Sequence, residues 1–257
     1  MTSGNFREKF SHLNDTNRKV FTHLPIPLCK LNAEIIDGRR YYTTPTGAKY
    51  PSVTTVLGEI SKPHISSWKA RVGEEEAKKI LTQACHRGTS VHDIAERYMR
   101  NAQDCLKGVF PFDAQSFAQI KPILDARVNN IRAIEYPLWS DRLRTAGRTD
   151  IIAEWDGRLA IIDFKTSRFP KEKQNIREYF MQATCYAMML KERINIDALD
   201  IVILMMVDHS EAIIFEEKTK NYLRETLNFF QKYHDPLNQV QKESSLESVH
   251  TQKRVPN

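Results

Sequence analysis

The sequence predicts a mixed α/β fold in which a sheet is flanked by helices and preceded by a helical N-terminal portion. Patterns typical of helices come first, three strand patterns follow, and then a helix, two strands and a last helix. The dipeptide Asp156-Gly157, between apolar β-prone segments, is typical of a two-residue hairpin. Ile151-Ile152 and Ile161-Ile162 make both hairpin strands apolar on both faces, as expected of central strands in a buried sheet.

The 257 residues are sufficient for one large domain. Residues 1–38 are polar, with two prolines near their end, and are expected to form an arm. A single domain is then expected over 39–235, with its helical portion at 52–134 and the sheet with its helices at 135–235. The polar segment 236–257 is expected to be a mobile tail.

The elements follow from turn residues and from apolar periodicity. Two short strands should flank the turn at Pro45-Thr46-Gly47, and Ser52 should cap a helix. Two helices are expected between 66 and 101, with the break near Gly88. The remaining expected elements are a helix at 117–134, strands at 133–138, 142–155 and 158–165, a helix at 176–192, strands at 199–207 and 211–216, and a helix at 218–233.

Composition excludes several classes of protein. No apolar run approaches the length of a membrane span, and the N-terminus has no apolar signal core, so a cytoplasmic location is expected without membrane partners. The four cysteines are far apart and include no Cys-x-x-Cys pair, which argues against a structural zinc site or a disulfide framework. The net charge of +6 suits a polyanionic partner but is weak evidence alone.

The hairpin carries the residues that point to chemistry. If Asp156-Gly157 forms the loop, Asp150 faces Asp163 across the two strands, with Cβ atoms roughly 5 Å apart. Lys165, two residues beyond Asp163, points to the same face. Opposed carboxylates repel each other, and a divalent cation with a nearby ammonium compensates them. The alternative is a surface hairpin with a coincidental set of charges, but buried carboxylates without partners are costly.

This Asp–hairpin–Asp-x-Lys arrangement resembles the core of the PD-(D/E)XK nuclease superfamily, whose fold is a restriction-endonuclease-like sheet flanked by helices. Ile162-Asp163-Phe164-Lys165-Thr166-Ser167 is similar to its RecB-like exonuclease branch. Two further marks of that branch are matched by Gly88-Thr89-Ser90-Val91-His92 and by Gln182-Ala183-Thr184-Cys185-Tyr186. Within the branch, the segment beginning Pro51-Ser52-Val53-Thr54-Thr55 resembles the mitochondrial genome maintenance exonucleases and their phage relatives.

The resemblance implies roles for these residues. His92, Asp150 and Asp163 would hold Mg²⁺ or Mn²⁺, with the Phe164 backbone carbonyl as a further ligand, and Lys165 would position the attacking water. A neutral imidazole is a common metal ligand, although His92 could instead pair with Glu96 one helical turn away. The iron–sulfur cluster of some relatives is not expected, because the chain has no cysteine after Cys185.

Contacts with DNA are also implied by the resemblance. Gln182 and Tyr186 share one helix face and would line the DNA channel, although without the resemblance a core helix with two polar edges is the preferred interpretation. Hydroxyl side chains near the motifs would contact phosphate; these are Thr166, Ser167, Ser52, Thr54 and Thr55. For Ser52, capping its own helix is the simpler interpretation.

Glu135, fifteen residues before Asp150, matches a glutamate of the family. One interpretation places it near the metal, through water or behind the ligands. The other makes it a solvated glutamate at the edge of a strand. The sequence leaves both open.

Together these features lead us to expect a Mg²⁺- or Mn²⁺-dependent DNA exonuclease that acts on free single-stranded ends in replication, recombination or repair. It would be located in the cytoplasm, in the host if a phage encodes it, with replication or recombination proteins as partners. One alternative is a structure-specific or flap endonuclease with the same core. The other is a catalytically inactive DNA-binding accessory protein.

Overall fold

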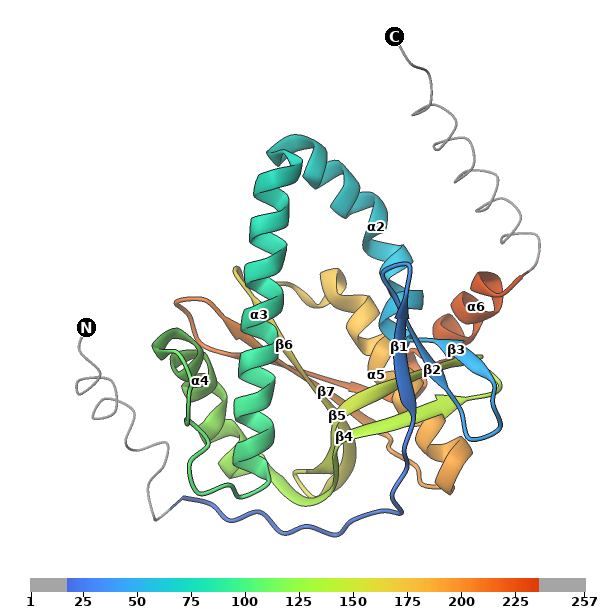
Figure 1. The fold of residues 1–257 in the computed structure, drawn as a ribbon. Helices are drawn as coiled ribbons and strands as arrows, with labels where there is room; N and C mark the ends of the chain where they lie inside the picture. Colours follow the sequence, from blue (N-terminus) through green and yellow to red (C-terminus); the bar gives the residue numbers. More distant parts are fainter. Residues whose placement is uncertain (1–17, 236–257) are drawn as a thin grey trace.

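The computed structural model describes residues 18–235 and shows a five-stranded sheet between two layers of helices (Figure 1). The strands lie in sequence order, and β6 and β7 are parallel while the other neighbours are antiparallel. The strands are β4 (Val128–Ser140), β5 (Thr145–Trp155), β6 (Arg158–Ser167), β7 (Asp200–Val207) and β8 (Ile213–Lys218). The crossover from β6 to β7 contains α5 (Arg177–Ile194), as a parallel connection requires.

Alternation along the strands divides the core between the two faces. In β7, Val202 and Leu204 pack in the core cluster of α3 (Glu74–Met99) and α4 (Pro111–Arg127). Their neighbours Ile201 and Ile203 pack in the cluster of α5, α6 (Leu223–Tyr233) and the start of α2 (Val53–Val72). All eight residues of β7 are buried, so the mixed α/β prediction with a buried central sheet is confirmed.

The segment expected to be an arm takes part in the fold from residue 18 onward. Residues 32–36 form β1 (Asn32–Ile36), which pairs with β2 (Arg39–Thr43), and β2 pairs in turn with β3 (Lys49–Pro51). Before β1, the Leu24 amide donates to the Ile131 carbonyl at 2.8 Å, at the edge of the main sheet. This pairing is made by backbone groups, so the polarity of the side chains did not reveal it. The predictions for residues 1–17 and 236–257 lie outside the described residues.

The two long helices break at Gly73, not near Gly88 as predicted. Gly73 has φ +87°, and its amide donates to the Lys69 carbonyl at 2.9 Å. α2 therefore ends at a backbone conformation that glycine adopts without strain. α2 and α3 rise from the sheet and meet there (Figure 1). α3 continues through Gly88, where an added Cβ would lie 3.7 Å from Thr166 Oγ1, an ordinary contact.

The predicted helix at 117–134 is replaced by a helix and a strand. α4 ends at Arg127, and the chain passes directly into β4, which pairs with β5 over most of its length. The register shifts between Asn129 and Ala133, and Asn130 has φ +41°. Long-range strand pairing therefore overrides the local apolar pattern.

Among the described residues, no helix is both long and apolar enough to span a membrane.

Gly147 in β5 lies against the ring of Tyr186, which is 2% exposed. A Cβ at this position would come within 2.8 Å of Tyr186 Cε1 and 2.9 Å of its Oη. We expect Gly147→Ala to lower the free energy of unfolding by about 1–3 kcal/mol, because the buried ring cannot move aside freely. Urea denaturation followed by circular dichroism measures the change.

Gly58→Ala in α2 is the matched control, since an added Cβ there meets nothing within 4 Å. Alanine in a helix interior is expected to raise the free energy of unfolding by about 0.5–1 kcal/mol. Equal stability of the two variants would contradict the steric explanation.

Candidate active site

The hairpin has the predicted register. β5 and β6 pair from Trp155–Arg158 to Ile151–Ile162, with Asp156 and Gly157 both at positive φ in the loop, as a type I′ turn requires. Asp150 and Asp163 are the next residues outward, just beyond the last pair of the ladder. There Asp150 Oδ2 accepts a hydrogen bond from the Phe164 amide at 2.8 Å, so the strands are held together by a side chain where backbone pairing stops.

Asp150, Asp163 and Lys165 share one face of the sheet. By alternation they follow Ile152 and Ile161, which pack in the α5 cluster. The Asp163 side chain is fully buried and Asp150 is 9% exposed. The hairpin therefore concentrates charged side chains inside the sheet, as the sequence predicts.

Asp163 is compensated by two side chains. Lys165 Nζ forms an ion pair with Asp163 Oδ2, and Gln182 Nε2 donates to Asp163 Oδ1 at 2.8 Å. Burial raises the pKa of Asp163 to about 6, against the lowering effect of Lys165 and together with repulsion from Asp150. Burial alone would lower the pKa of Lys165, but Asp163 and Asp150 outweigh it and raise that pKa. Lys165 is therefore an ammonium, suited to stabilise negative charge and not to accept a proton.

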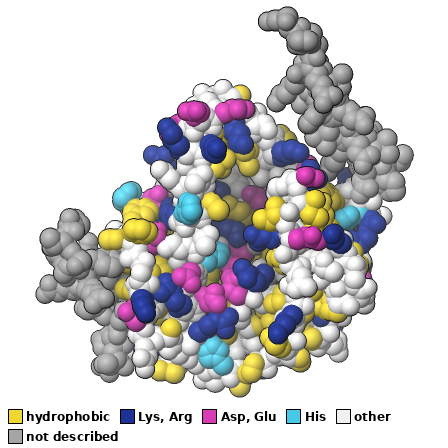
Figure 2. All heavy atoms as spheres, in the orientation of Figure 1, with side chains coloured by type: hydrophobic (Ala, Val, Ile, Leu, Met, Phe, Trp, Pro, Cys, Tyr) yellow, Lys and Arg dark blue, Asp and Glu magenta, His cyan; other side chains and the backbone are white. Residues whose placement is uncertain are grey.

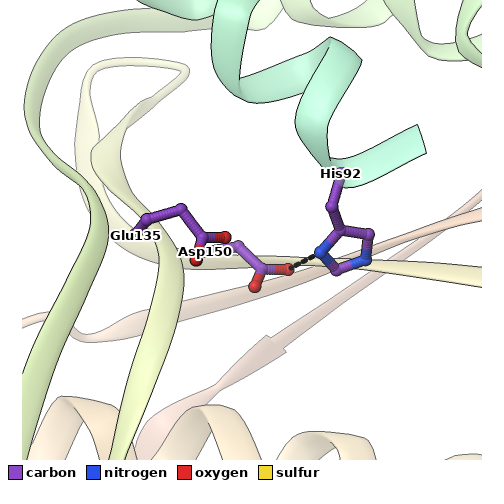
Figure 3. Close-up of side chains that lie close together, drawn as sticks. All are labelled: His92, Glu135 and Asp150. Atoms are coloured by element: carbon purple, nitrogen blue, oxygen red, sulfur yellow. Dashed lines mark ion pairs between the residues drawn. The ribbon is translucent and has the colours of Figure 1, made fainter. Parts of the chain in front are cut away.

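A second group of ligand atoms lies on the other side of Asp150. His92 from α3, Glu135 from β4 and Asp150 from β5 bring one ligand atom each to within 4.8 Å of one another (Figure 3). On this side of the molecule, acidic, basic and histidine side chains gather around a hollow (Figure 2). Two carboxylates and an imidazole fit a hard divalent cation such as Mg²⁺ or Mn²⁺.

His92 is oriented by contacts of both ring nitrogens. Its Nε2 donates to the Phe164 carbonyl at 2.9 Å, and its Nδ1 lies 3.4 Å from Asp150 Oδ2. A backbone carbonyl that fixes one ring nitrogen leaves the other available as a metal ligand. The alternative pairing of His92 with Glu96 is not observed, because Glu96 instead pairs with Arg100 at 2.9 Å.

Glu135 lies closer to the site than the sequence indicated. Ile134 pairs with Ile151 and Tyr136 with Thr149, so Glu135 stands opposite Asp150 in the β4–β5 register. Its φ of +52° is rare for a residue with a side chain and is typical of strained functional positions.

The carboxylate of Glu135 is partly compensated. Arg148 Nε lies 2.6 Å from Glu135 Oε2. Burial and then the charge of Asp150 raise the pKa of Glu135 to about 7, against the lowering effect of Arg148. Glu135 is therefore a half-buried member of the group of potential ligands, on the edge strand β4.

The expected ligand set and the group of nearby ligand atoms thus differ. Asp163 is outside the group, and its two oxygens instead pair with Lys165 and Gln182. The Phe164 carbonyl is engaged by His92. His92 and Asp150 belong to both sets.

α5 contributes a polar face to the site. Gln182 is 9% exposed and reaches Asp163, while Tyr186 is 2% exposed and packs against Gly147. Tyr179, one turn before Gln182, was missed in the sequence, and its ring lies 5.1 Å from Lys165 Nζ. Helical spacing from Gln182 places Tyr179 on the same face, and this was the available signal.

The hydroxyl side chains separate into two places. Ser52 Oγ accepts from the Thr55 amide at 3.0 Å, which is the capping role. Thr54 and Thr55 line a cavity of about 470 Å³ together with Arg39, Arg40 and Lys62. Thr166 faces Gly88 on α3, and Ser167 Oγ donates to the Phe169 carbonyl at 2.7 Å.

Comparison with known proteins adds evidence independent of this geometry. A family model described as the PD-(D/E)XK nuclease superfamily matches residues 114–243. Mitochondrial genome maintenance exonuclease 1 of Mus musculus is 26% identical over 129 residues, and that of Homo sapiens is 30% identical over 131 residues. Each match covers 47% of this chain and only 38% of the relative. A solved structure from Eubacterium rectale is 12% identical with a TM-score of 0.41, over 57% of this chain and 64% of that one.

Glu135→Gln should stabilise the metal-free protein. At pH 8 the wild-type carboxylate is charged beside Asp150, and the amide removes that repulsion, so we expect the free energy of unfolding to rise by about 1–3 kcal/mol. Because folding raises the pKa of Glu135 to about 7, the wild type regains stability as the pH falls from about 7 toward 4.5. The difference between the two proteins should therefore shrink from pH 8 to pH 5, as measured by urea denaturation in EDTA.

Glu154→Gln is the matched control on β5, where the carboxylate accepts from Asn130 Nδ2 at 2.7 Å. Removing that charge should not stabilise the protein. A Glu135→Gln variant that is no more stable than wild type at pH 8 would show that the carboxylates do not repel each other as described.

Proposed function

The chain belongs to the PD-(D/E)XK nuclease superfamily, and on this premise we propose that it is a divalent-metal-dependent DNA exonuclease that acts on free single-stranded ends. The observation that carries the proposal is the presence of three carboxylates on three neighbouring strands, Glu135, Asp150 and Asp163, beside an ammonium. Such a concentration of buried negative charge is costly unless a cation neutralises it.

The residues around Asp150 fit Mg²⁺ or Mn²⁺. We propose His92, Glu135 and Asp150 as ligands, because their ligand atoms lie within 4.8 Å of one another. Asp163 and the Phe164 carbonyl are further candidates at the same level of the sheet. When bound, the metal would polarise a phosphoryl oxygen and favour hydroxide near neutral pH.

The side chains of the chain itself would divide the remaining work. Lys165 would place its ammonium against the phosphate oxygens, whose negative charge grows as water attacks phosphorus. Gln182 holds the Asp163 carboxylate that orients this ammonium. The Phe164 carbonyl keeps His92 in one ring orientation. These contacts support a preorganised hydrolytic site.

The choice of an exonuclease on DNA rests on the relatives, which are named genome maintenance exonucleases and of which the match covers 38%. We propose roles in DNA replication, recombination or repair, with replication or recombination proteins as partners. The location would be the cytoplasm, or the cytoplasm of the host if a phage encodes the protein. These roles agree with a site in which the carboxylates hold a cation and the DNA strand reaches Lys165.

Lys165→Ala should lower the rate of hydrolysis of linear single-stranded DNA in Mg²⁺ by about 100-fold or more, because one preorganised charge is lost from the transition state. Lys220→Ala, an exposed lysine in the short helix Thr219–Asn221, is the control and should leave the rate unchanged. Release of acid-soluble nucleotides measures the rate. Full activity of the Lys165→Ala variant would contradict the proposed role of the ammonium.

Linear and circular DNA distinguish the candidate activities. Wild type should degrade linear single strands in Mg²⁺ or Mn²⁺ and leave a circular single strand of the same sequence intact. Cleavage of the circle would establish an endonuclease. Absence of hydrolysis on linear, circular, duplex and flap DNA with either metal would leave only a DNA-binding protein.

A further inference from the structure

The segment that follows β6, the strand that carries Asp163 and Lys165, has an aromatic side chain exposed to solvent. Phe169 is 68% exposed, two residues after the last residue of β6. Single exposed apolar residues are common in folded proteins and need no function of their own. The residues around Phe169 decide whether it is one of these.

Cationic and aromatic side chains form two pairs in and beside this segment. The Arg168 guanidinium lies 5.6 Å from the centre of the Phe169 ring. Lys171 Nζ donates to Tyr179 Oη at 3.0 Å and lies 5.2 Å from the centre of that ring. Lys165 Nζ lies 5.1 Å from the same ring, so Tyr179 connects this segment to the ammonium of the active site.

The backbone of the segment is held in place. Ser167 Oγ donates to the Phe169 carbonyl at 2.7 Å, and the Ser167 carbonyl accepts from the Asp208 amide at 3.0 Å. Pro170 fixes its own φ and restricts the backbone of Phe169 to extended conformations. An aromatic ring presented on a restrained backbone loses little entropy when it binds a ligand.

Interleaved aromatic and cationic side chains are the chemistry by which proteins hold single-stranded nucleic acid, through base stacking and phosphate contacts. Four residues of extended chain span at most about 14 Å, so Phe169 lies close to Lys165. A base that reached its ring would therefore belong to a nucleotide near the reacting phosphodiester. Bases inside a duplex are already stacked on both faces and are not available to such a ring.

We propose that Arg168, Phe169, Lys171 and Tyr179 form a nucleotide subsite next to the reaction centre. Phe169 stacks on an unpaired base, Arg168 and Lys171 contact the adjoining phosphates, and Tyr179 holds Lys171 in position. This inference rests on the proposed nuclease function and deepens it, because it gives a physical reason for a preference for single strands.

Binding without hydrolysis tests the stacking. Fluorescence anisotropy of a fluorescein-labelled single-stranded oligonucleotide, in EDTA, should show about 5- to 100-fold weaker affinity for Phe169→Leu than for wild type. Phe169→Tyr, which keeps a ring, should bind nearly as wild type. Phe110→Leu is the matched control, since Phe110 is 75% exposed at the N-cap of α4, and it should bind as wild type.

Salt dependence tests the phosphate contact separately. Lys171→Gln should lower the slope of the logarithm of affinity against the logarithm of salt concentration by about 0.7, the value for one contact with a single strand. Phe169→Leu should leave that slope unchanged, because stacking releases no counterions. Lys220→Gln is the charge-matched control and should also leave it unchanged.

An oligonucleotide with abasic sites completes the test. Wild type should bind it as weakly as Phe169→Leu binds the intact strand, and the two losses should not add, since both remove the same stack. Equal binding of the intact strand by wild type and Phe169→Leu overturns the subsite. A loss that is equally large on the abasic strand overturns it as well.

Hydrolysis of linear single-stranded DNA by wild type in Mg²⁺ is measured in parallel. Phe169-dependent binding without hydrolysis would overturn the nuclease function and support the subsite. Hydrolysis with affinity independent of Phe169 would overturn the subsite and support the nuclease function.

Discussion

Three carboxylates stand on neighbouring strands at one level of a buried sheet, and their repulsion constrains everything around them. Asp150 on β5, the middle one of the three strands, interacts with Glu135 on one side and Asp163 on the other, and both neighbours have a raised pKa, about 7 and about 6. The coulombic energy between such groups is large where water is excluded. The fold compensates it with Lys165 and Arg148 as cations and with hydrogen bonds to Asp150 and Asp163.

These compensations come from every layer of the molecule. α3 provides His92, the sheet provides the Phe164 amide, and α5 provides Gln182 and Tyr179. The helices can reach the same point because backbone pairing between β5 and β6 ends at Ile151–Ile162 and leaves polar groups open there. The site is thus formed where the regular sheet stops, and the apolar core on both faces keeps those strand ends in place.

The same end of β6 also gives the site its connection to solvent. From Lys165 to Phe169 the side chains change from half-buried to exposed. Lys165 and Lys171 both lie near the ring of Tyr179. The ammonium that would act on the phosphate and the ammonium that would hold the strand therefore contact the same aromatic side chain. Chemistry and substrate positioning would therefore be coupled through α5.

The sequence by itself determined the hairpin, because Asp156-Gly157 permits the positive φ values of a type I′ turn and the alternation of side chains then places Asp150, Asp163 and Lys165 on one face. It also indicated His92 and Gln182 through helical spacing and resemblance. Only the tertiary structure decided the place of Glu135, because that depends on the β4–β5 register beyond the irregularity at Asn129 and Ala133. The helix break at Gly73 and the contact of Tyr179 with Lys165 were decided in the same way, since packing between distant segments outweighs weak local preferences.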